Sequence, residues 1–125
     1  MVDEWKARPD RPGAMPLLHV RLAEQIERLK EEVTWRTSGR GAITLTKKPG
    51  LRVVLLLLRS GARIPEHQAP GTLTLQVLSG SVVFRRGDRQ ETVGTGEPIM
   101  LEAAIEHDGE ALEESACLLT LAAAV

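Results

Sequence analysis

The sequence predicts one all-β domain, a sandwich or barrel, with an α-helix before it. A length of 125 residues fits a single domain of ordinary size. From residue 41 onward, short runs rich in Val, Leu, Ile and Thr are separated by Gly, Pro or Asp, which is the pattern of strands and turns. Before residue 41, apolar residues recur at helical spacing. We therefore expect an N-terminal arm and amphipathic helix over 1–40 and a β-barrel over 41–125.

The N-terminal region divides again into an arm and a helix. Prolines stand among charged residues up to position 16, so 1–16 is expected to be a loose arm whose Pro16 opens a helix at its favoured first turn. The helix is expected over 17–33. One apolar stripe follows it, formed by Leu18, Leu22, Ile26, Leu29 and Val33. This stripe needs a surface to cover, which is the barrel of the same chain or a second copy, and we expect a homodimer held by the outer face of the barrel and by the helix over 17–33.

Eight strands are expected after the helix. They lie near 42–47, 51–59, 72–78, 81–86, 90–93, 98–101, 108–112 and 115–122. Within the second of them, residues 53–58 are apolar on both faces. A strand of this kind is covered on both sides. Eight short strands at this spacing are typical of a sandwich or barrel.

The composition excludes several classes of protein. With 16 Lys and Arg against 17 Asp and Glu, and only Trp5, Trp35 and Phe84 as aromatic residues, no nucleic-acid surface is predicted. The apolar runs are shorter than the roughly 20 residues that cross a bilayer, so no membrane partner is expected. The N-terminus does not have the pattern of a secretory signal, which predicts a cytoplasmic protein. A single cysteine, Cys117, cannot form an intrachain disulfide or a Cys-rich zinc site.

Two spaced motifs in the strand-rich region resemble a known superfamily. Gly61, His67 and Gly80 fall on the pattern G-x5-H-x-H-x3-E-x6-G, and Gly96 and His107 fall on G-x5-P-x-G-x2-H. These are the two motifs of the cupin superfamily, and residues 41–122 resemble a small single-domain bacterial cupin. The resemblance implies a double-stranded β-helix, the jelly-roll cupin barrel, with an N-terminal α-helical extension. It also implies a ligand pocket inside the barrel.

The motifs depart from the family at the positions that hold a metal ion. A cupin centre takes two histidines and a carboxylate from the first motif and one histidine from the second. Here Ala69 and Leu73 replace the second histidine and the carboxylate, so only His67 and His107 remain. Two imidazoles would hold a divalent transition metal such as Zn, Ni, Mn or Fe only weakly unless other groups join them. No cofactor is certain from the sequence.

Other polar residues could complete the site. Gln76 is a candidate through its amide oxygen, although strand alternation counted from Leu73 places residues 75 and 77, rather than 76, on the pocket face. We retain Gln76 with His67 and His107 as a candidate pocket residue. Residues 97–125 hold seven acidic residues and no Lys or Arg. We expect them to form a solvated rim that discourages anionic ligands.

Three functions remain open from the sequence. The first is a cupin that binds a small, fairly apolar molecule in the barrel, with His67 and His107 as polar groups and little or no tightly bound metal. The second is a metal-dependent cupin enzyme, of the dioxygenase, isomerase or decarboxylase type, with an incomplete two-histidine site. The third is a structural or regulatory module that uses its helix as an interaction surface. Fold alone does not choose among them.

Overall fold

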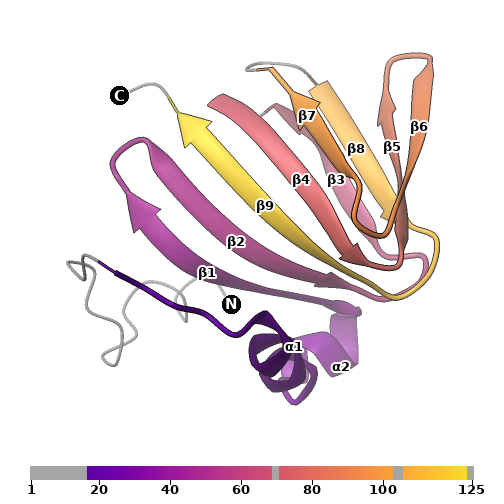
Figure 1. The fold of residues 1–125 in the computed structure, drawn as a ribbon. Coiled ribbons are helices and arrows are strands. Elements are labelled where there is room, and N and C mark those ends of the chain that lie inside the picture. Colours follow the sequence, from indigo (N-terminus) through magenta and orange to yellow (C-terminus); the bar gives the residue numbers. More distant parts are fainter. Residues whose placement is uncertain (1–16, 69–70, 103–105, 124–125) are drawn as a thin grey trace.

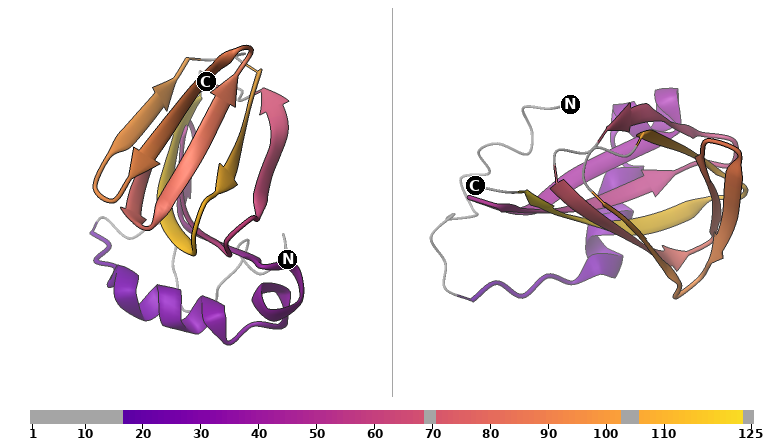
Figure 2. Two further views of the ribbon diagram at one scale, coloured as in Figure 1. Left: turned by 90° about the vertical axis from the view of Figure 1, so that its right-hand side faces the viewer. Right: turned by 90° about the horizontal axis from the view of Figure 1, so that it is seen from above.

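A computed structural model describes residues 17–68, 71–102 and 106–123 of the chain. Two β-sheets face each other, and two short helices pack on the outer face of one sheet, at the end of that sheet where its first two strands lie (Figure 1, Figure 2). In order along the chain, the described elements are α1 (Leu22–Lys30), α2 (Val33–Ser38), β1 (Arg40–Lys48), β2 (Leu51–Leu58), β3 (Arg63–Gln68), β4 (Gly71–Ser79), β5 (Ser81–Arg86), β6 (Arg89–Gly94), β7 (Pro98–Leu101), β8 (Glu106–Ala111) and β9 (Ser115–Ala123).

The strand order is that of a jelly roll. The five-stranded sheet has the order β1-β2-β9-β4-β7 and the four-stranded sheet has the order β3-β8-β5-β6. Every pairing between neighbouring strands is antiparallel. Consecutive strands repeatedly change sheets, for example from β2 to β3 and from β8 to β9. This confirms the predicted all-β class with its N-terminal helical extension.

The sequence pattern missed one strand. β3 carries Pro65, which lacks a backbone donor, and turn residues flank it on both sides. Its register with β8 shifts between Ile64 and His67, so the pairing is irregular around that proline. A strand with a proline and a bulge has no clean two-residue alternation, and for that reason periodicity alone did not predict it.

The predicted helix over 17–33 is shorter and is followed by a second helix. Residues 17–21 are not helical, α1 ends at Lys30, and α2 follows after a two-residue break. The break turns the chain so that Trp35 of α2 is buried, at 7% exposed, in the same apolar cluster as Leu29 of α1. Tertiary packing therefore overrides the continuous stripe, and Val33 is left 65% exposed. Pro16, the predicted helix start, lies outside the described residues.

The two faces of the five-stranded sheet contribute to two separate hydrophobic clusters. On the outer face, the helix cluster joins Leu29 and Trp35 to Leu55 and Leu57 of β2. On the inner face, the barrel cluster joins Leu56 of β2 to residues of both sheets, among them Val77 and Phe84. The prediction that residues 53–58 are covered on both faces is confirmed, because alternate side chains of β2 enter the two clusters.

Neither described helix has the length and apolar character needed to cross a membrane.

Candidate ligand pocket

His107 lies inside the barrel. It belongs to β8, is 1% exposed, and stacks on the ring of Phe84 with a centroid distance of 5.3 Å and an interplanar angle of 22°. Gly109, two residues further along the same face, is paired with Phe84, and a Cβ at Gly109 would stand 3.4 Å from that ring. The glycine therefore leaves room for the Phe84 ring between the strands, and Phe84 in turn supports the imidazole.

The backbone brings the two predicted histidine positions together. In the antiparallel pairing of β3 with β8, His67 is the cross-strand partner of His107. Positions directly opposite each other in such a pair lie about 4.5 to 5.5 Å apart. The side chain of His67 and the whole of Ala69 lie outside the described residues. The strand register therefore pairs the two positions at the backbone. The role of the two side chains is a proposal.

The motif position that carries the carboxylate in cupins is part of the apolar wall. Leu73 of β4 is 5% exposed and is paired with Leu101 on one side and with Leu121 on the other. Among the described residues, no group of three or more His, Cys, Asp or Glu side chains is arranged to hold a metal ion. The described residues thus do not fit the four-ligand centre that the resemblance implies, and we derive no chemistry from such a centre.

The placement of Gln76 in the pocket was wrong. Its neighbours Leu75 and Val77 are 1% and 0% exposed within the barrel cluster, while Gln76 itself is exposed. Strand alternation therefore directs its side chain to the outer face of the sheet. There its Nε2 donates a hydrogen bond to the carbonyl oxygen of Gly96, at 3.4 Å.

The acidic residues after residue 97 form the expected solvated rim only in part: Glu97 and Glu102 are exposed and line a cavity beside β7, whereas the acids of β8 are paired with arginines. Because His107 faces inward, strand alternation places Asp108 and Glu110 on the outward face of β8. Both carboxylates form ion pairs with Arg85 there. Arg63 also pairs with Asp108, at 3.2 Å. Further along the chain, Glu114 forms an ion pair with Lys30 of α1 at 2.9 Å. The hydrogen bond between them raises the pKa of Lys30. Much of this negative charge is matched by cations outside the barrel.

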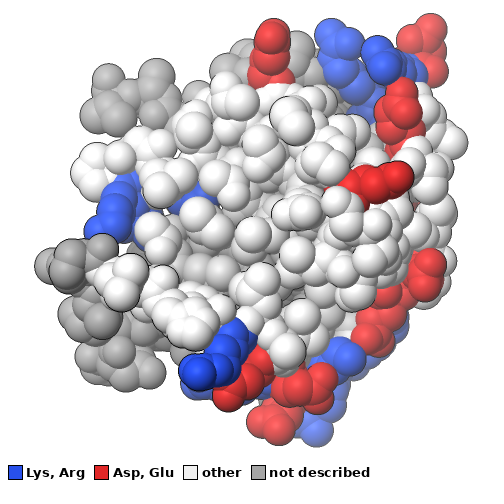
Figure 3. All heavy atoms as spheres, in the orientation of Figure 1, with Lys and Arg blue, Asp and Glu red and all other residues white. Residues whose placement is uncertain are grey.

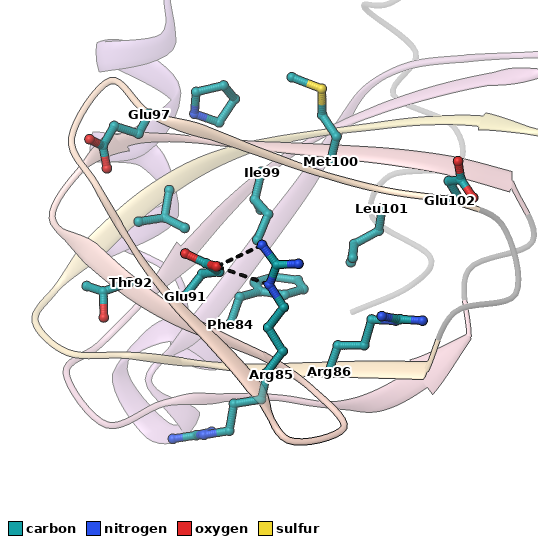
Figure 4. A pocket seen from close by; sticks show the side chains of 13 residues that line it. Phe84, Arg85, Arg86, Glu91, Thr92, Glu97, Ile99, Met100, Leu101 and Glu102 are labelled. Atoms are coloured by element: carbon teal, nitrogen blue, oxygen red, sulfur yellow. Dashed lines mark hydrogen bonds and ion pairs between the residues drawn. The ribbon is translucent and has the colours of Figure 1, made fainter.

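A cavity of about 880 Å³ opens between the β5–β6 hairpin and β7 (Figure 4). Its apolar wall includes Phe84, Val93, Ile99 and Leu101. Its polar wall includes Arg86, Arg89, Glu91 and Glu102. Phe84 connects the cavity to His107, because the same ring lines the cavity and stacks on the imidazole.

The arginines of this cavity were not among the predicted site residues. The segment Phe84-Arg85-Arg86-Gly87-Asp88-Arg89 lies between the two motifs, so their spacing does not point to it. A usable pattern was present, because alternation counted from the apolar Val82 and Phe84 places Arg86 on the interior face. Arg89 follows across the hairpin as the cross-strand partner of Arg86.

Cys117 belongs to the packing of the barrel. It is 0% exposed in the barrel cluster, and burial raises the pKa of its thiol to about 12. A thiol with so high a pKa has almost no thiolate at neutral pH, and the thiolate is the nucleophilic form. Cys117 therefore acts as a small apolar side chain.

Comparisons with known proteins identify the fold. No protein-family description matches the sequence, and no curated protein sequence matches it. Among solved structures, a conserved Streptococcus pyogenes protein of unknown function has a TM-score of 0.70 at 22% identity over 90% of this chain and 98% of its own. A cupin-2 domain protein from Shewanella frigidimarina has a TM-score of 0.67 at 12% identity, over 82% of this chain and 93% of its own.

A third similar structure is an enzyme. Salicylate 1,2-dioxygenase from Pseudaminobacter salicylatoxidans has a TM-score of 0.78 at 16% identity, and the match covers 90% of this chain but 36% of that one. At such identities, the likeness concerns the fold rather than the activity. Together with the strand order and the paired histidine positions, it identifies this chain as a cupin-fold protein.

Proposed function

We propose that this cupin-fold protein binds a small molecule inside its barrel, with His67 and His107 as polar groups and little or no tightly held metal. The observation that carries the proposal is the buried His107, which stacks on the ring that lines the cavity. The cavity combines an apolar wall with several charged side chains, and a concave site with convergent polar groups is a common form of small-molecule site. The apolar Leu73 at the carboxylate position favours such a ligand over a resident metal ion. A cytoplasmic location stays a prediction.

A fragment screen by heteronuclear NMR tests this function. We expect ligands of the barrel to shift the backbone amide signals of Phe84 and His107. The variant His107→Phe keeps an aromatic ring but removes the ring nitrogens, so it should weaken these ligands about tenfold. The matched control His19→Phe changes an exposed histidine outside the barrel and should leave binding unchanged. If no fragment shifts the barrel signals, or if both variants behave alike, the proposal is wrong.

A metal-dependent enzyme is the second candidate, and the likeness to a dioxygenase favours it. Elemental analysis of protein purified without chelator and without a histidine tag separates the two. Substoichiometric metal supports the small-molecule binder, whereas one tightly held ion per chain supports the enzyme. As a test of the register, the double variant Ala69→His, Leu73→Glu should raise the affinity for Mn, Ni or Zn tenfold or more in calorimetry. No gain would mean that the motif is aligned wrongly.

We also propose that the protein forms a homodimer through the outer face of the five-stranded sheet. The helix stripe serves its own barrel, because Leu22, Ile26 and Leu29 pack in the helix cluster. Beyond the helices, this face presents a broad surface almost without charged side chains (Figure 3). Its outward residues include Thr74 and Thr120, both partly exposed, and at the border with the helix cluster Val53 and Leu118, which pack against that cluster and stay partly exposed. An uncharged face meets its own copy across a two-fold axis without repulsion.

Light scattering at micromolar concentration tests the dimer. Thr74→Arg would place like charges on both sides of the two-fold axis, so we expect it to give monomers of about the chain mass, 13.7 kDa. Thr37→Arg, on the exposed side of α2, is the matched control and should leave the dimer intact. A wild-type protein that is monomeric at this concentration contradicts the proposal.

A further inference from the structure

Three cationic or titratable side chains form one row across the four-stranded sheet at the open end of the barrel. Arg86 is the cross-strand partner of Arg89, and Arg85 is that of Asp108. One step further along β5 and β8 brings position 86 opposite position 107. His107, Arg86 and Arg89, which we name the basic row, therefore occupy neighbouring positions on β8, β5 and β6.

The basic row lies on the face of the sheet that carries the barrel cluster, with His107 buried and Arg86 and Arg89 exposed at its rim. Phe84, two residues before Arg86, is 3% exposed in the barrel cluster, so strand alternation gives Arg86 the same face. Arg86 and Arg89 both line the cavity, and Figure 4 shows Arg86 below Leu101 of β7. Another part of the cavity wall is made by β7, whose four residues are all apolar, among them Ile99 and Leu101.

The charges of the three neighbouring arginines are balanced differently. Arg85 is matched on the outer face by Asp108 and Glu110. Arg89 is matched by Glu91, whose Oε2 accepts a hydrogen bond from its Nε at 3.1 Å and forms an ion pair with its Nη2 at 3.1 Å. Within the described part of the chain, Arg86 has no ion pair or side-chain hydrogen bond, which leaves its guanidinium available to a ligand.

The remaining acids of the cavity limit the charge of that ligand. Glu102 is exposed at the end of the cavity wall, and Glu97, also exposed, accepts a hydrogen bond from the Gly94 backbone N–H at 2.7 Å. One unmatched guanidinium near these carboxylates suits a single negative charge better than a double one. A planar guanidinium binds a carboxylate through two parallel hydrogen bonds.

We propose that the cavity binds a small organic monocarboxylate, whose carboxylate pairs with Arg86 and whose apolar body lies between Phe84 and the side chains of β7. This inference rests on the proposed binding function and names its ligand class. It narrows the expectation of an acidic rim that repels anions, because Asp108 and Glu110 of β8 are matched by arginines outside the barrel and only Glu97 and Glu102 of that run line the cavity. Phe84 links the bound molecule to His107.

Three probes of similar shape and different charge test the ligand class. Benzoate is the monocarboxylate, benzamide is its neutral counterpart, and phenyl phosphate carries the alternative anion. In NMR titrations that follow the amide signals of Phe84 and Arg86, we expect benzoate to bind about tenfold more tightly than benzamide. The proposal would be overturned if benzamide bound as tightly as benzoate. It would also be overturned if phenyl phosphate bound more tightly than benzoate and lost this affinity in Arg86→Gln, because the ligand class would then be a phosphate.

Variants then assign the preference to Arg86. Arg86→Gln should weaken benzoate about tenfold and leave benzamide within twofold, whereas Arg86→Lys should keep part of the preference. The control Arg63→Gln removes an exposed arginine from the outer face of the same sheet and should change neither probe. Equal benzoate affinity in wild type and Arg86→Gln, with unchanged melting temperatures, would overturn the assignment. If neutral fragments shift the barrel signals and carboxylates do not, this inference fails while the proposed function stands. If nothing binds, both fail.

Discussion

The two faces of the five-stranded sheet have the same strands but different roles. On the outer face, Leu55 and Leu57 meet Leu29 of α1 in a closed apolar cluster. The inner face, with Val77, packs in the apolar barrel cluster against Phe84 of the four-stranded sheet, and toward the open end that second sheet carries histidine and arginine side chains. The first arrangement stabilises the fold, while the second leaves room for a ligand. The difference indicates that substitutions on the outer face change stability and that those at the open end change binding.

The largest effect is expected at the centre of the helix cluster. Leu29 is 1% exposed, so Leu29→Ala removes a buried side chain and should lower the free energy of unfolding by about 2 to 5 kcal/mol. Alanine is a good helix former, so the loss would come from packing. Urea unfolding measures it, and the folded variant should bind benzoate as the wild type does. Leu18→Ala, at a residue 40% exposed, is the control, expected within about 0.5 kcal/mol of wild type.

The next largest effect is expected at one of the two glycines of the first motif, where alanine should cost much more stability than at the other. Both have positive φ, 84° at Gly61 and 94° at Gly80. A Cβ at Gly61 would meet open space, but one at Gly80 would collide with the Ser115 side chain and the Glu114 carbonyl oxygen. We expect Gly80→Ala to cost about 3 kcal/mol or more in unfolding free energy and Gly61→Ala about 1 kcal/mol. Equal costs would show that the β4–β5 connection does not approach the β8–β9 connection this closely.

The buried thiol of the inner face should make stability depend on pH. Burial raises the pKa of Cys117 from 9.0 to about 12, so above pH 9 the unfolded chain loses a proton that the folded chain keeps. Stability from this group is therefore complete below pH 9 and falls as pH rises toward 12, by up to about 1.4 kcal/mol per pH unit. Urea unfolding between pH 8 and 10.5 measures the slope. Cys117→Ala should be less stable at pH 8 and should lack this part of the slope; an identical slope would contradict the assignment.

The smallest effect is expected where the helices meet the barrel at its surface. The Arg59 guanidinium lies 5.2 Å from the ring centroid of Trp35 and donates a hydrogen bond to the Trp35 carbonyl oxygen at 3.2 Å. Arg59 is exposed, so Arg59→Gln should cost about 0.5 to 1 kcal/mol. Thermal unfolding measures the change, and Arg28→Gln on the exposed side of α1 is the control. A loss of ligand binding in Arg59→Gln would contradict the separation between the two faces.

Much of the fold could be predicted because the strands are bounded by clear turn residues and because β2 is apolar on both faces. The pattern failed at β3, where Pro65 and the irregular register remove the alternation. It also failed at the helix, where burial of Trp35 decided the break. The spacing of the glycines and histidines placed His67 and His107 as partners, which the register of β3 with β8 bears out at the backbone.

The sequence by itself determined the all-β class, the two-sided burial of β2 and the inward position of residues 75 and 77, because each depends on local alternation or on turn residues. Only the tertiary structure decided the electrostatics of the cavity. Whether an arginine of β5 has a carboxylate partner depends on strands that are far apart in the chain. The partners of Arg85, for example, lie 23 and 25 residues away on β8, whereas Arg86 next to it has none among the described residues. Charge counts along a sequence do not reveal such pairings, because antiparallel strand register, not proximity in the chain, places each cation against its acid.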